Sequence, residues 1–548
     1  MVYIKSNAEQ TLLLPTDMRT IIPKDHICFL IEEVVNQLNY DDFDQKVNGP
    51  GSPSYHPRVN LKIILNGICE RITSTRKLEK QTMENVVFRY LSENLNPDFH
   101  TIAMFRKENR DLIKKCFLQT VEIAKKLDMV NFNKLYLDGI KVKANASKSK
   151  TFTKDEIDFL SEFVDRQFEE TEKIDKEEDK KYGESNGEIK IPEHLTHRRK
   201  LKEKVKEMLK DIDRAKEQID KAKIRMQEKN EKEVNLTDMD SKIMKMKKGV
   251  CYEQAYNCQL LVEDKGEIIV GNYITDSPTD IYETRPTMEK FKEEQKVSLK
   301  GVEVFQDNGY MGSDTAEYYK EEEAIAYIPD RVTTKELHGK SEKISKFDND
   351  KFELDFEKNQ AICPEGYRMN FVRRETNKNG NWTNIYRTDK CRDCKYQKEC
   401  TEKNSGSRLR ITKINPLIRE IRLRFKTKEG IEKYNKRFHK GEVAQAHIFQ
   451  NLGYREFKCR DKGPCENEMN LFSTAYNMVK IYKKWKERGR NLDSSVKNIF
   501  YVVSYYFFKR ITTQPARKTE RLSYFKNVRY FICNFNVQKR FKRRLQFS

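Results

Sequence analysis

The sequence lacks any hydrophobic run long enough to cross a lipid bilayer. Its longest apolar stretch, IFYVVSYYFF at 499–508, is well short of the ~20 residues that a membrane-spanning helix needs. The opening residues, MVYIKSNAEQTLLLP, also lack the continuous apolar segment of a secretory signal. We therefore expect a cytoplasmic protein with no membrane partner.

Acidic residues are too few to balance the basic ones. The 548 residues include 86 Asp and Glu against 107 Lys and Arg, which gives a formal net charge of +21. A chain this basic usually binds a polyanion, and nucleic acid is the first candidate. The length suits about three or four domains of ~150 residues each.

Much of the surplus charge lies in the last residues of the chain. Residues 481–548 contain 18 Lys and Arg against 3 Asp and Glu, interleaved with many Tyr and Phe. A basic run of this kind is often only a solvated surface. The density of charge and the aromatic residues favour a contact with nucleic acid.

Residues 58–128 have the periodicity of helices. RVNLKIILNGICERI and RDLIKKCFLQTVEIAKKLDMV both repeat apolar residues at three- and four-residue spacing. Between them, Asp98 is a candidate N-cap for a helix that carries Arg106 and Lys107. This fits a DNA-binding helix-turn-helix unit, and equally a small helical bundle whose basic residues are only solvated.

Residues 150–248 differ from their surroundings in charge and periodicity. The part from 154 to 180 has 12 acidic and 5 basic residues, and Phe159, Phe163 and Phe168 recur at helical spacing. A basic segment follows, with apolar residues alternately four and three positions apart, as in a coiled coil. This seam consists of Leu201, Val205, Met208, Ile212, Ala215, Ile219, Ala222 and Met226. It could form a dimer, but the opposite charges of the two segments favour an internal hairpin.

Strand-like sequence stands before and after that segment. KLYLDGIKVKANAS alternates apolar residues into Asp138-Gly139, and 253–275 is two strands around the turn Asp264-Lys265-Gly266. A helix is expected near 280–296. The apolar run from Val302 then ends in Asp307-Asn308-Gly309. This order predicts a mixed sheet flanked by helices.

Four of the twelve cysteines lie within 38 residues. They are Cys363, Cys391, Cys394 and Cys400. Without a secretory signal, such a group indicates free thiols or a metal site, not a disulfide framework. One structural zinc ion held by four thiolates would order a segment that has little apolar sequence.

Three acidic residues are candidates for one site. Asp138 and Asp307 each follow an apolar strand, and Glu442 is in the helical segment 415–450. Aspartate at a strand end is common in turns for purely local reasons. A carboxylate fixed there is also suited to bind a metal ion, provided that the fold brings partners to it.

Several motifs, in this order, resemble those of bacterial insertion-sequence transposases of the DDE, RNase H-like class with an all-helical N-terminal domain. The resemblance covers roughly 50–485. It rests on HPRVNLKIILNGICERITSTRKLE, NPDFHTIAMFR, YLDGIKVKANAS, TDMDSKIMKMKKGVCYEQAYNCQLLVED, QDNGYMGSD and YNKRFHKGEVAQAHIFQNLGYREFK.

The resemblance implies a site and its chemistry. Asp138, Asp307 and Glu442 match the catalytic DDE triad, which holds two Mg²⁺ (or Mn²⁺) ions and cuts and joins DNA by two-metal phosphodiester chemistry. Tyr434 and Arg437 match a tyrosine and an arginine that precede the glutamate. The family usually has a lysine seven positions after the glutamate, where this chain has Phe449, with Arg455 as the nearby basic residue. The DNA-binding candidates are Tyr434, Arg437, Arg455, Arg106 and Lys107.

The fold that follows is an α/β RNase H-like catalytic core, with an all-α N-terminal domain, a helical or coiled-coil insertion and a cysteine-rich insertion. We expect a helical DNA-binding domain at 1–130, the core at 131–149, 249–330 and 413–485, the insertions at 150–248 and 331–412, and a basic tail at 486–548.

The function expected from the resemblance is that of a transposase. It would cleave double-stranded DNA at the terminal inverted repeats of its element and transfer the strands to target DNA as a homodimer. Two alternatives stay open. One is a metal nuclease of the same fold without strand transfer, and the other is an inactive copy that only binds DNA.

The basic tail should raise affinity for DNA without selecting its sequence. Phosphate contacts supply affinity that falls steeply with salt, and sequence is read by other contacts. Truncation after about residue 490 should weaken binding to end DNA and random DNA by a similar factor, with a shallower salt dependence. Binding measured across a salt series tests this. Loss of end-specific binding alone would make the tail a sequence reader.

Overall fold

The computed structural model describes most of the chain. The described residues are 17–44, 54–178, 211–246, 251–329, 347, 351–355, 358–376, 382–400, 409–412 and 415–487. The basic tail beyond 487 and the seam residues Leu201, Val205 and Met208 lie outside them, so those expectations are not addressed by the structure. The elements discussed below lie in one compact unit, Met1–Lys484, except for the last residues of α19.

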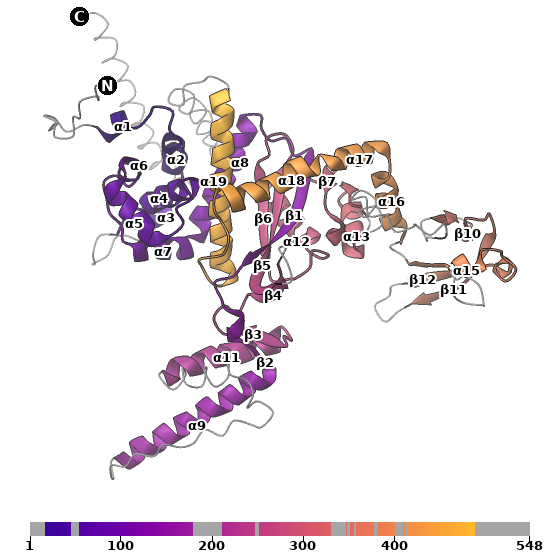
Figure 1. The fold of residues 1–548 in the computed structure, drawn as a ribbon, viewed down its shortest axis with the longest axis horizontal. Coiled ribbons are helices and arrows are strands. Elements are labelled where there is room, and N and C mark those ends of the chain that lie inside the picture. Colours follow the sequence, from indigo (N-terminus) through magenta and orange to yellow (C-terminus); the bar gives the residue numbers. More distant parts are fainter. Residues whose placement is uncertain are drawn as a thin grey trace, which may run out of the picture. The chain divides into compact units, whose positions relative to one another are not determined.

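The N-terminal part is helical, as its periodicity predicts (Figure 1). Its helices are α1 (Met18–Ile21), α2 (Ile27–Asn36), α3 (Asp41–Asp44), α4 (Pro57–Cys69), α5 (Thr75–Glu84), α6 (Val86–Leu91), α7 (Phe99–Glu108) and α8 (Arg110–Lys126). Asp98 caps α7, because its side chain accepts a hydrogen bond of 2.7 Å from the backbone N–H of Thr101. α4 is buried over nearly its whole length and forms the centre of this group.

A mixed sheet follows, with β1 at its centre. Its strands are β1 (Lys134–Lys143), β4 (Lys242–Lys245), β5 (Tyr252–Glu263), β6 (Ile269–Thr275), β7 (Glu303–Phe305) and β8 (Ile325–Tyr327). β5 pairs antiparallel with β1 on one side and with β4 and β6 on the other. β7 pairs parallel with β1, and β8 parallel with β7. β4 belongs to this sheet although it precedes residue 249, where we expected the core to resume.

Helices cover both faces of the sheet. Parallel neighbours require crossover connections, and α12 (Thr284–Gln295) and α13 (Ser313–Glu321) supply them before and after β7. On the opposite face, α18 (Arg437–Ala446) lies against β1 and β5. The long helix α19 (Lys462–Glu487) is hydrogen-bonded to β6. The side-chain amide of Asn477 accepts from the N–H of Ile269 at 2.9 Å and donates to its C=O at 2.8 Å.

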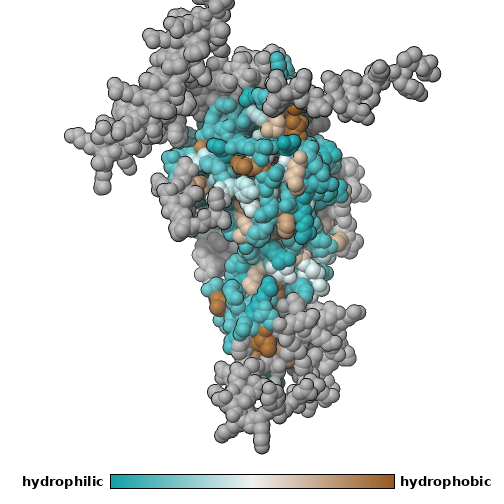
Figure 2. Space-filling view, turned by 90° about the vertical axis from the view of Figure 1, so that its left-hand side faces the viewer, coloured by the Kyte–Doolittle hydropathy of each residue, from teal (hydrophilic) through white to brown (hydrophobic). Residues whose placement is uncertain are grey.

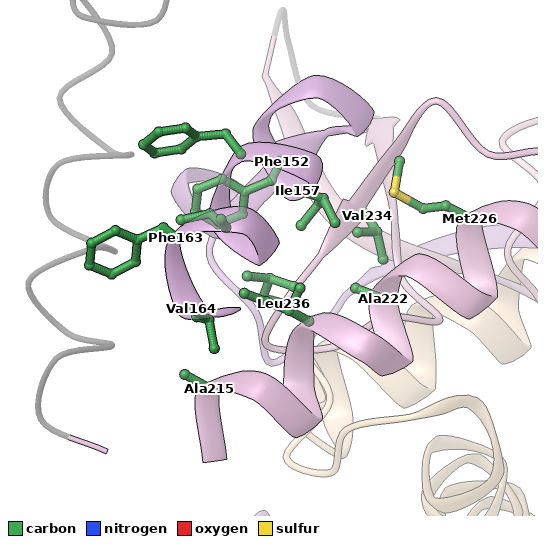
Figure 3. Packing of buried hydrophobic residues seen from close by; sticks show 12 residues of the cluster. Phe152, Ile157, Phe163, Val164, Ala215, Ala222, Met226, Val234 and Leu236 are labelled. Carbon is green, nitrogen blue, oxygen red and sulfur yellow. The ribbon is translucent and has the colours of Figure 1, made fainter. Parts of the chain in front are cut away.

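The first insertion is an internal helical hairpin in its described part. α9 (Lys154–Glu178) packs against α11 (Ile212–Glu228), and short strands β2 (Thr151–Thr153) and β3 (Glu233–Asn235) pair at its base. Its core joins phenylalanines from the acidic segment to the second half of the seam (Figure 3). The seam residues in this core are Ala215, Ile219, Ala222 and Met226. The seam therefore meets α9 of the same chain.

The second insertion contains a five-stranded antiparallel sheet. Its strands are β9 (Glu353–Asp355), β10 (Gln360–Ile362), β11 (Arg368–Thr376), β12 (Trp382–Arg387) and β13 (Leu409–Thr412). A small apolar core includes Phe352, Met369 and Tyr386, and Cys363 and Cys400 pack against it. The helices α16 (Asn415–Phe425) and α17 (Lys428–Asn435) then lead to α18.

The surface reflects the charge-rich composition. On the face seen in Figure 2, the described residues are mostly hydrophilic, and hydrophobic residues form small separate groups. Among the described helices, none combines the length and the apolar character that a membrane span requires. This agrees with the sequence, in which apolar residues make up 37%.

Two isoleucines on α11 provide a test of the hairpin. Ile219 is 1% exposed in the core and Ile224 is 55% exposed on the outer side. Ile219→Ala should lower the free energy of unfolding of the hairpin by about 2–5 kcal/mol and speed amide hydrogen exchange in α9 by roughly 30-fold or more. Ile224→Ala should change the free energy of unfolding by no more than about 0.5 kcal/mol. Equal effects, or exchange that varies with protein concentration, would instead indicate an intermolecular coiled coil.

Candidate active site

The two candidate aspartates lie side by side because of the register between β1 and β7. Tyr136 on β1 pairs with Phe305 on β7, and Asp138 and Asp307 each follow two residues later. The two rings stack with centroids 5.0 Å apart, and Phe305 stacks in turn on Tyr327 of β8 at 4.9 Å. Such cross-strand aromatic pairs stabilise a register. The ladder therefore places Asp138, in the middle of β1, beside Asp307, which lies two residues beyond the end of β7.

Asp138 is buried and ion-paired. It is 5% exposed, and its Oδ1 lies 3.0 Å from Nη2 of Arg437, which is itself 4% exposed. A buried carboxylate stays charged only where a countercharge or hydrogen bonds compensate it. Arg437, the first residue of α18, supplies that charge.

Asp307 lies two residues beyond the end of β7 and caps the short helical turn η3 (Asn308–Tyr310). Its Oδ1 accepts a hydrogen bond of 2.7 Å from the backbone N–H of Gly309. This is the local role that aspartate often has before a turn. The side chain is still partly exposed, so the turn leaves it open to a ligand.

Glu442 reaches the same place from α18. Its side chain is 47% exposed, and its Oε1 lies 3.8 Å from Nη1 of Arg437. The preceding residue is Gly441, where a β-carbon would lie 3.4 Å from Cβ of Tyr136, so the helix packs closely on β1. The guanidinium of Arg437 thus lies between Asp138 and Glu442.

The electrostatics of this cluster agree with its geometry. Burial alone would lower the pKa of Arg437, but Asp138, Asp307 and Glu442 outweigh it, and the pKa is raised. Burial, with Asp307 and Asp138 nearby, raises the pKa of Tyr434 to about 12. All three carboxylates therefore act on one buried guanidinium.

A π-helical turn, His447–Asn451, ends α18. Turns of this type often occur at functional sites. His447 packs edge-on against Tyr476 with ring centroids 5.3 Å apart. Burial and then the nearby Lys483, Lys480 and Arg71 lower the pKa of His447 to about 4, so it is neutral at pH 7.

The basic residues expected to bind DNA divide into buried and exposed ones. Arg106 is 8% exposed, donates to the backbone carbonyl of Thr73 at 3.4 Å, and lies 4.0 Å from Glu468. A buried, ion-paired arginine does not reach base edges, so the structure contradicts the expectation for Arg106. Lys107 and Arg455 are exposed.

Tyr434 and Arg437 are also turned inward. Tyr434 is buried, and its ring packs edge-on against Phe425 at 4.8 Å. Arg437 contacts Asp138 and Glu442, and the sequence motif did not indicate either contact. The contact with Asp138 depends on the packing of α18 against β1.

One carboxylate near the site was missed in the sequence. Asp280 lies between β6 and α12, within 3.6 Å of where a β-carbon of Gly309 would stand. The segment ITDSPTDIY that contains it reads as an ordinary loop. Only the fold brings it beside the aspartates.

The four clustered cysteines meet in the second insertion. Cys363, Cys391, Cys394 and Cys400 all line one cavity, together with apolar side chains such as Phe352 and Met369. Four cysteines that come from separate turns and line one cavity fit the four thiolate ligands of a structural zinc ion.

Neither the cysteines nor the carboxylates are drawn together as tightly as bound ligands. Among the described residues, no group of three or more histidine, cysteine, aspartate or glutamate side chains is arranged to hold a metal ion. The donor chemistry of each set nevertheless fits the metal that the sequence suggests. Carboxylate oxygen suits Mg²⁺, and four thiolates suit Zn²⁺. At the carboxylates, Arg437 supplies the positive charge.

Comparison with known proteins gives two family matches. A transposase DDE domain matches residues 362–482, which include Glu442 and the four cysteines. A transposase domain (DUF772) matches residues 16–108, which correspond to the helices α1–α7. Asp138 and Asp307 lie between the two matched segments.

Other comparisons add little. No curated protein matches the chain. Among solved structures, a piggyBac transposase synaptic complex with hairpin DNA overlaps 94% of this chain and 87% of that chain, at 10% identity and a TM-score of 0.31. At this score the overlap carries no argument about the fold. The two matched domains, in the order DUF772 and then DDE, confirm the resemblance to insertion-sequence DDE transposases that the motifs indicated.

Proposed function

We propose that the chain is a metal-dependent transposase that cleaves DNA at the ends of its element and joins those ends to target DNA. The observation that carries the proposal is the convergence of three carboxylates on one buried arginine. Asp138 and Arg437 are 3.0 Å apart, Glu442 and Arg437 3.8 Å apart, and Asp307 follows the strand beside Asp138. The family matches support the same reaction class.

The order of the strands supports an RNase H-like core. The central strand β1 pairs antiparallel with β5 on one side and parallel with β7 on the other. Beyond these, β6 pairs antiparallel with β5, and β8 pairs parallel with β7. In α/β folds, ligands bind at the carboxyl ends of strands. Asp307 lies just beyond the carboxyl end of β7, and Asp138 is beside it.

Asp138, Asp307 and Glu442 would hold the catalytic ions. Two Mg²⁺ ions, when bound, activate water or a 3′-OH and neutralise the leaving oxygen. The protein's own contribution is to hold its carboxylates at fixed positions and to balance their charge through Arg437 before metal and DNA bind. Glu442 is the most exposed of the carboxylates that Arg437 contacts, so it is the one best able to move.

The assignment of domains follows from this function. We propose that the helices α1–α8 contact the ends of the element, with Lys107 on the exposed side, and that Arg455 contacts DNA near Glu442. Joining two ends in one reaction requires two copies of the site, so the DNA-bound form would be a homodimer. Double-stranded DNA in the cytoplasm is the expected partner.

We also propose that Cys363, Cys391, Cys394 and Cys400 bind one structural zinc ion. The shared cavity and the small size of the apolar core beside it support this, because a core of that size gains much of its stability from a metal. Four thiolates leave no open position for catalysis.

Substitution of the carboxylates tests the catalytic proposal. Asp138→Asn, Asp307→Asn and Glu442→Gln should each lower metal-dependent cleavage of a plasmid carrying the reading frame and its flanking DNA. The loss should exceed ~100-fold, since changes in residues that merely support metal ligands already cost 10–100-fold. Glu432→Gln, an exposed glutamate on α17, serves as the matched control. Full activity of Asp307→Asn would refute the site.

Detection of joined products separates the transposase from a nuclease of the same fold. Wild-type protein should yield molecules in which cut ends are covalently linked to target DNA. Cleavage without such products would favour the nuclease. Binding with neither cleavage nor joining would favour an inactive copy.

Metal analysis tests the zinc proposal. Purified protein should contain about one zinc per chain, with Zn–S distances near 2.3 Å. Cys394→Ser should lose the zinc and destabilise the second insertion. Cys251→Ser should keep it, because Cys251 is exposed and lies outside the cavity. Zinc at the same level in both variants would exclude the four-cysteine site.

A further inference from the structure

A buried polar network lies behind the two candidate aspartates. Asp280 accepts hydrogen bonds on Oδ1 from the side-chain amides of two residues of β5, Asn257 at 2.7 Å and Gln259 at 2.9 Å. Both amides are fully buried. A carboxylate that binds two buried donors of one strand fixes its own loop against that strand.

The network continues to the turn after Asp307. The buried hydroxyl of Tyr310, in η3, donates to the amide oxygen of Gln259. The amide of Gln259 thus uses its nitrogen toward Asp280 and its oxygen toward Tyr310, which fixes its orientation. The chain of contacts Asp280–Gln259–Tyr310 ends three residues after Asp307. Burial, with Asp280, Asp138 and Asp307 nearby, raises the pKa of Tyr310, so the hydroxyl stays a donor.

The same network packs closely against Gly139, the residue after Asp138. Gln259 pairs directly with Gly139 across the sheet. A β-carbon at position 139 would lie 2.5 Å from Oδ1 of Asp280, 2.8 Å from Nε2 of Gln259 and 3.1 Å from the hydroxyl of Tyr310. A side chain cannot fit there without displacing the network. Glycine at 139 is therefore required by this contact.

Successive residues of a strand point to opposite faces of the sheet. Asp138 faces α18 and Arg437, whereas Gly139 faces Asp280. The network therefore supports the strand on the face away from α18, and among the described residues none of its hydrogen bonds goes to Glu442 or Arg437. It links the residue after Asp138 to the turn after Asp307.

We propose that Asp280 is a positioning residue, which through Gln259 and Tyr310 holds β1 and the Asp307 turn at the separation that metal binding needs. This inference rests on the proposed function for its consequence in catalysis. Residues that orient metal ligands typically change metal affinity 10–100-fold when altered. Asp280 would act through its hydrogen bonds and not as a ligand.

Four variants test the proposal. Asp280→Ala removes the acceptor, Tyr310→Phe removes the last donor, and Asp280→Asn keeps an acceptor oxygen without the charge. Tyr256→Phe is the matched control. The hydroxyl of Tyr256 is also buried and on β5 next to β1, but it donates to Asp238 at 2.6 Å and takes no part in the network. The readouts are Mn²⁺ binding, measured by the shift in melting temperature, and amide hydrogen exchange of residues 308–311 without metal.

Asp280→Ala and Tyr310→Phe should each raise the Mn²⁺ concentration for half-maximal stabilisation about tenfold and speed exchange in the turn. Their effects should not add in the double variant, since they break one network. Asp280→Asn should stay within about threefold of wild type, because its oxygen can accept the same two hydrogen bonds. Tyr256→Phe should lower stability without either effect.

Two results would overturn the inference. One is that Asp280→Ala and Tyr310→Phe match Tyr256→Phe in both readouts. The other is that Asp280→Asn loses Mn²⁺ as fully as Asp280→Ala, which would make the charge of Asp280, not its hydrogen bonds, the cause. If wild-type protein neither binds Mn²⁺ nor cuts DNA, the proposed function fails, and exchange in the Asp307 turn still decides whether the network positions it.

Discussion

The buried ion pair between Arg437 and Asp138 is the contact on which the candidate site depends. A carboxylate as buried as Asp138 needs a countercharge, and removing one partner of such a pair typically costs about 3–5 kcal/mol. Because Arg437 begins α18, meeting Asp138 fixes where that helix starts against β1. Glu442 then follows in the same helix, and Gly441 permits the close approach. One electrostatic requirement thus places two of the three carboxylates.

The third carboxylate is placed by pairing between strands. Asp307 lies two residues beyond the end of β7, and the stacked rings of Tyr136, Phe305 and Tyr327 hold β7 and β8 beside β1. Stacking contributes only about 0.2–1 kcal/mol per pair, but a slip by one residue would turn every side chain to the other face. The register therefore matters more than the energy of any single contact. The loop carrying Asp280 then holds the turn from the far side of the sheet.

Sequence alone predicted the elements of the core well, because each carries a local signal. The hairpin around Gly266, the N-cap at Asp98 and the pairing of the two charged segments all follow from periodicity, turn residues or charge. The strand end expected at Asp138 is wrong, because β1 continues through Asp138 and Gly139 to Lys143, paired with β5. The contacts between distant segments could not be predicted in the same way. Arg106 looked like a DNA-binding residue because it is basic and helical, yet Glu468, far along the chain, draws it inward. Nothing in the residues around Asp280 indicates its position near the site, because its hydrogen-bond partners Asn257 and Gln259 lie on β5.

The two ends of the helical insertion are held together at its base. β2 and β3 pair at its base, and the side chain of Asn235 bonds the carbonyl of Ser147 at 2.8 Å and the hydroxyl of Thr151 at 3.0 Å. The chain therefore leaves the sheet after β1 and returns at β4 almost as if a short loop joined them. Loop-closure entropy grows only slowly with length, and the hairpin has a core of its own to offset it. Lys143, the last residue of β1, and Lys242, the first of β4, both pair with Ala255 of β5, so the chain returns to the sheet beside the place where it left it.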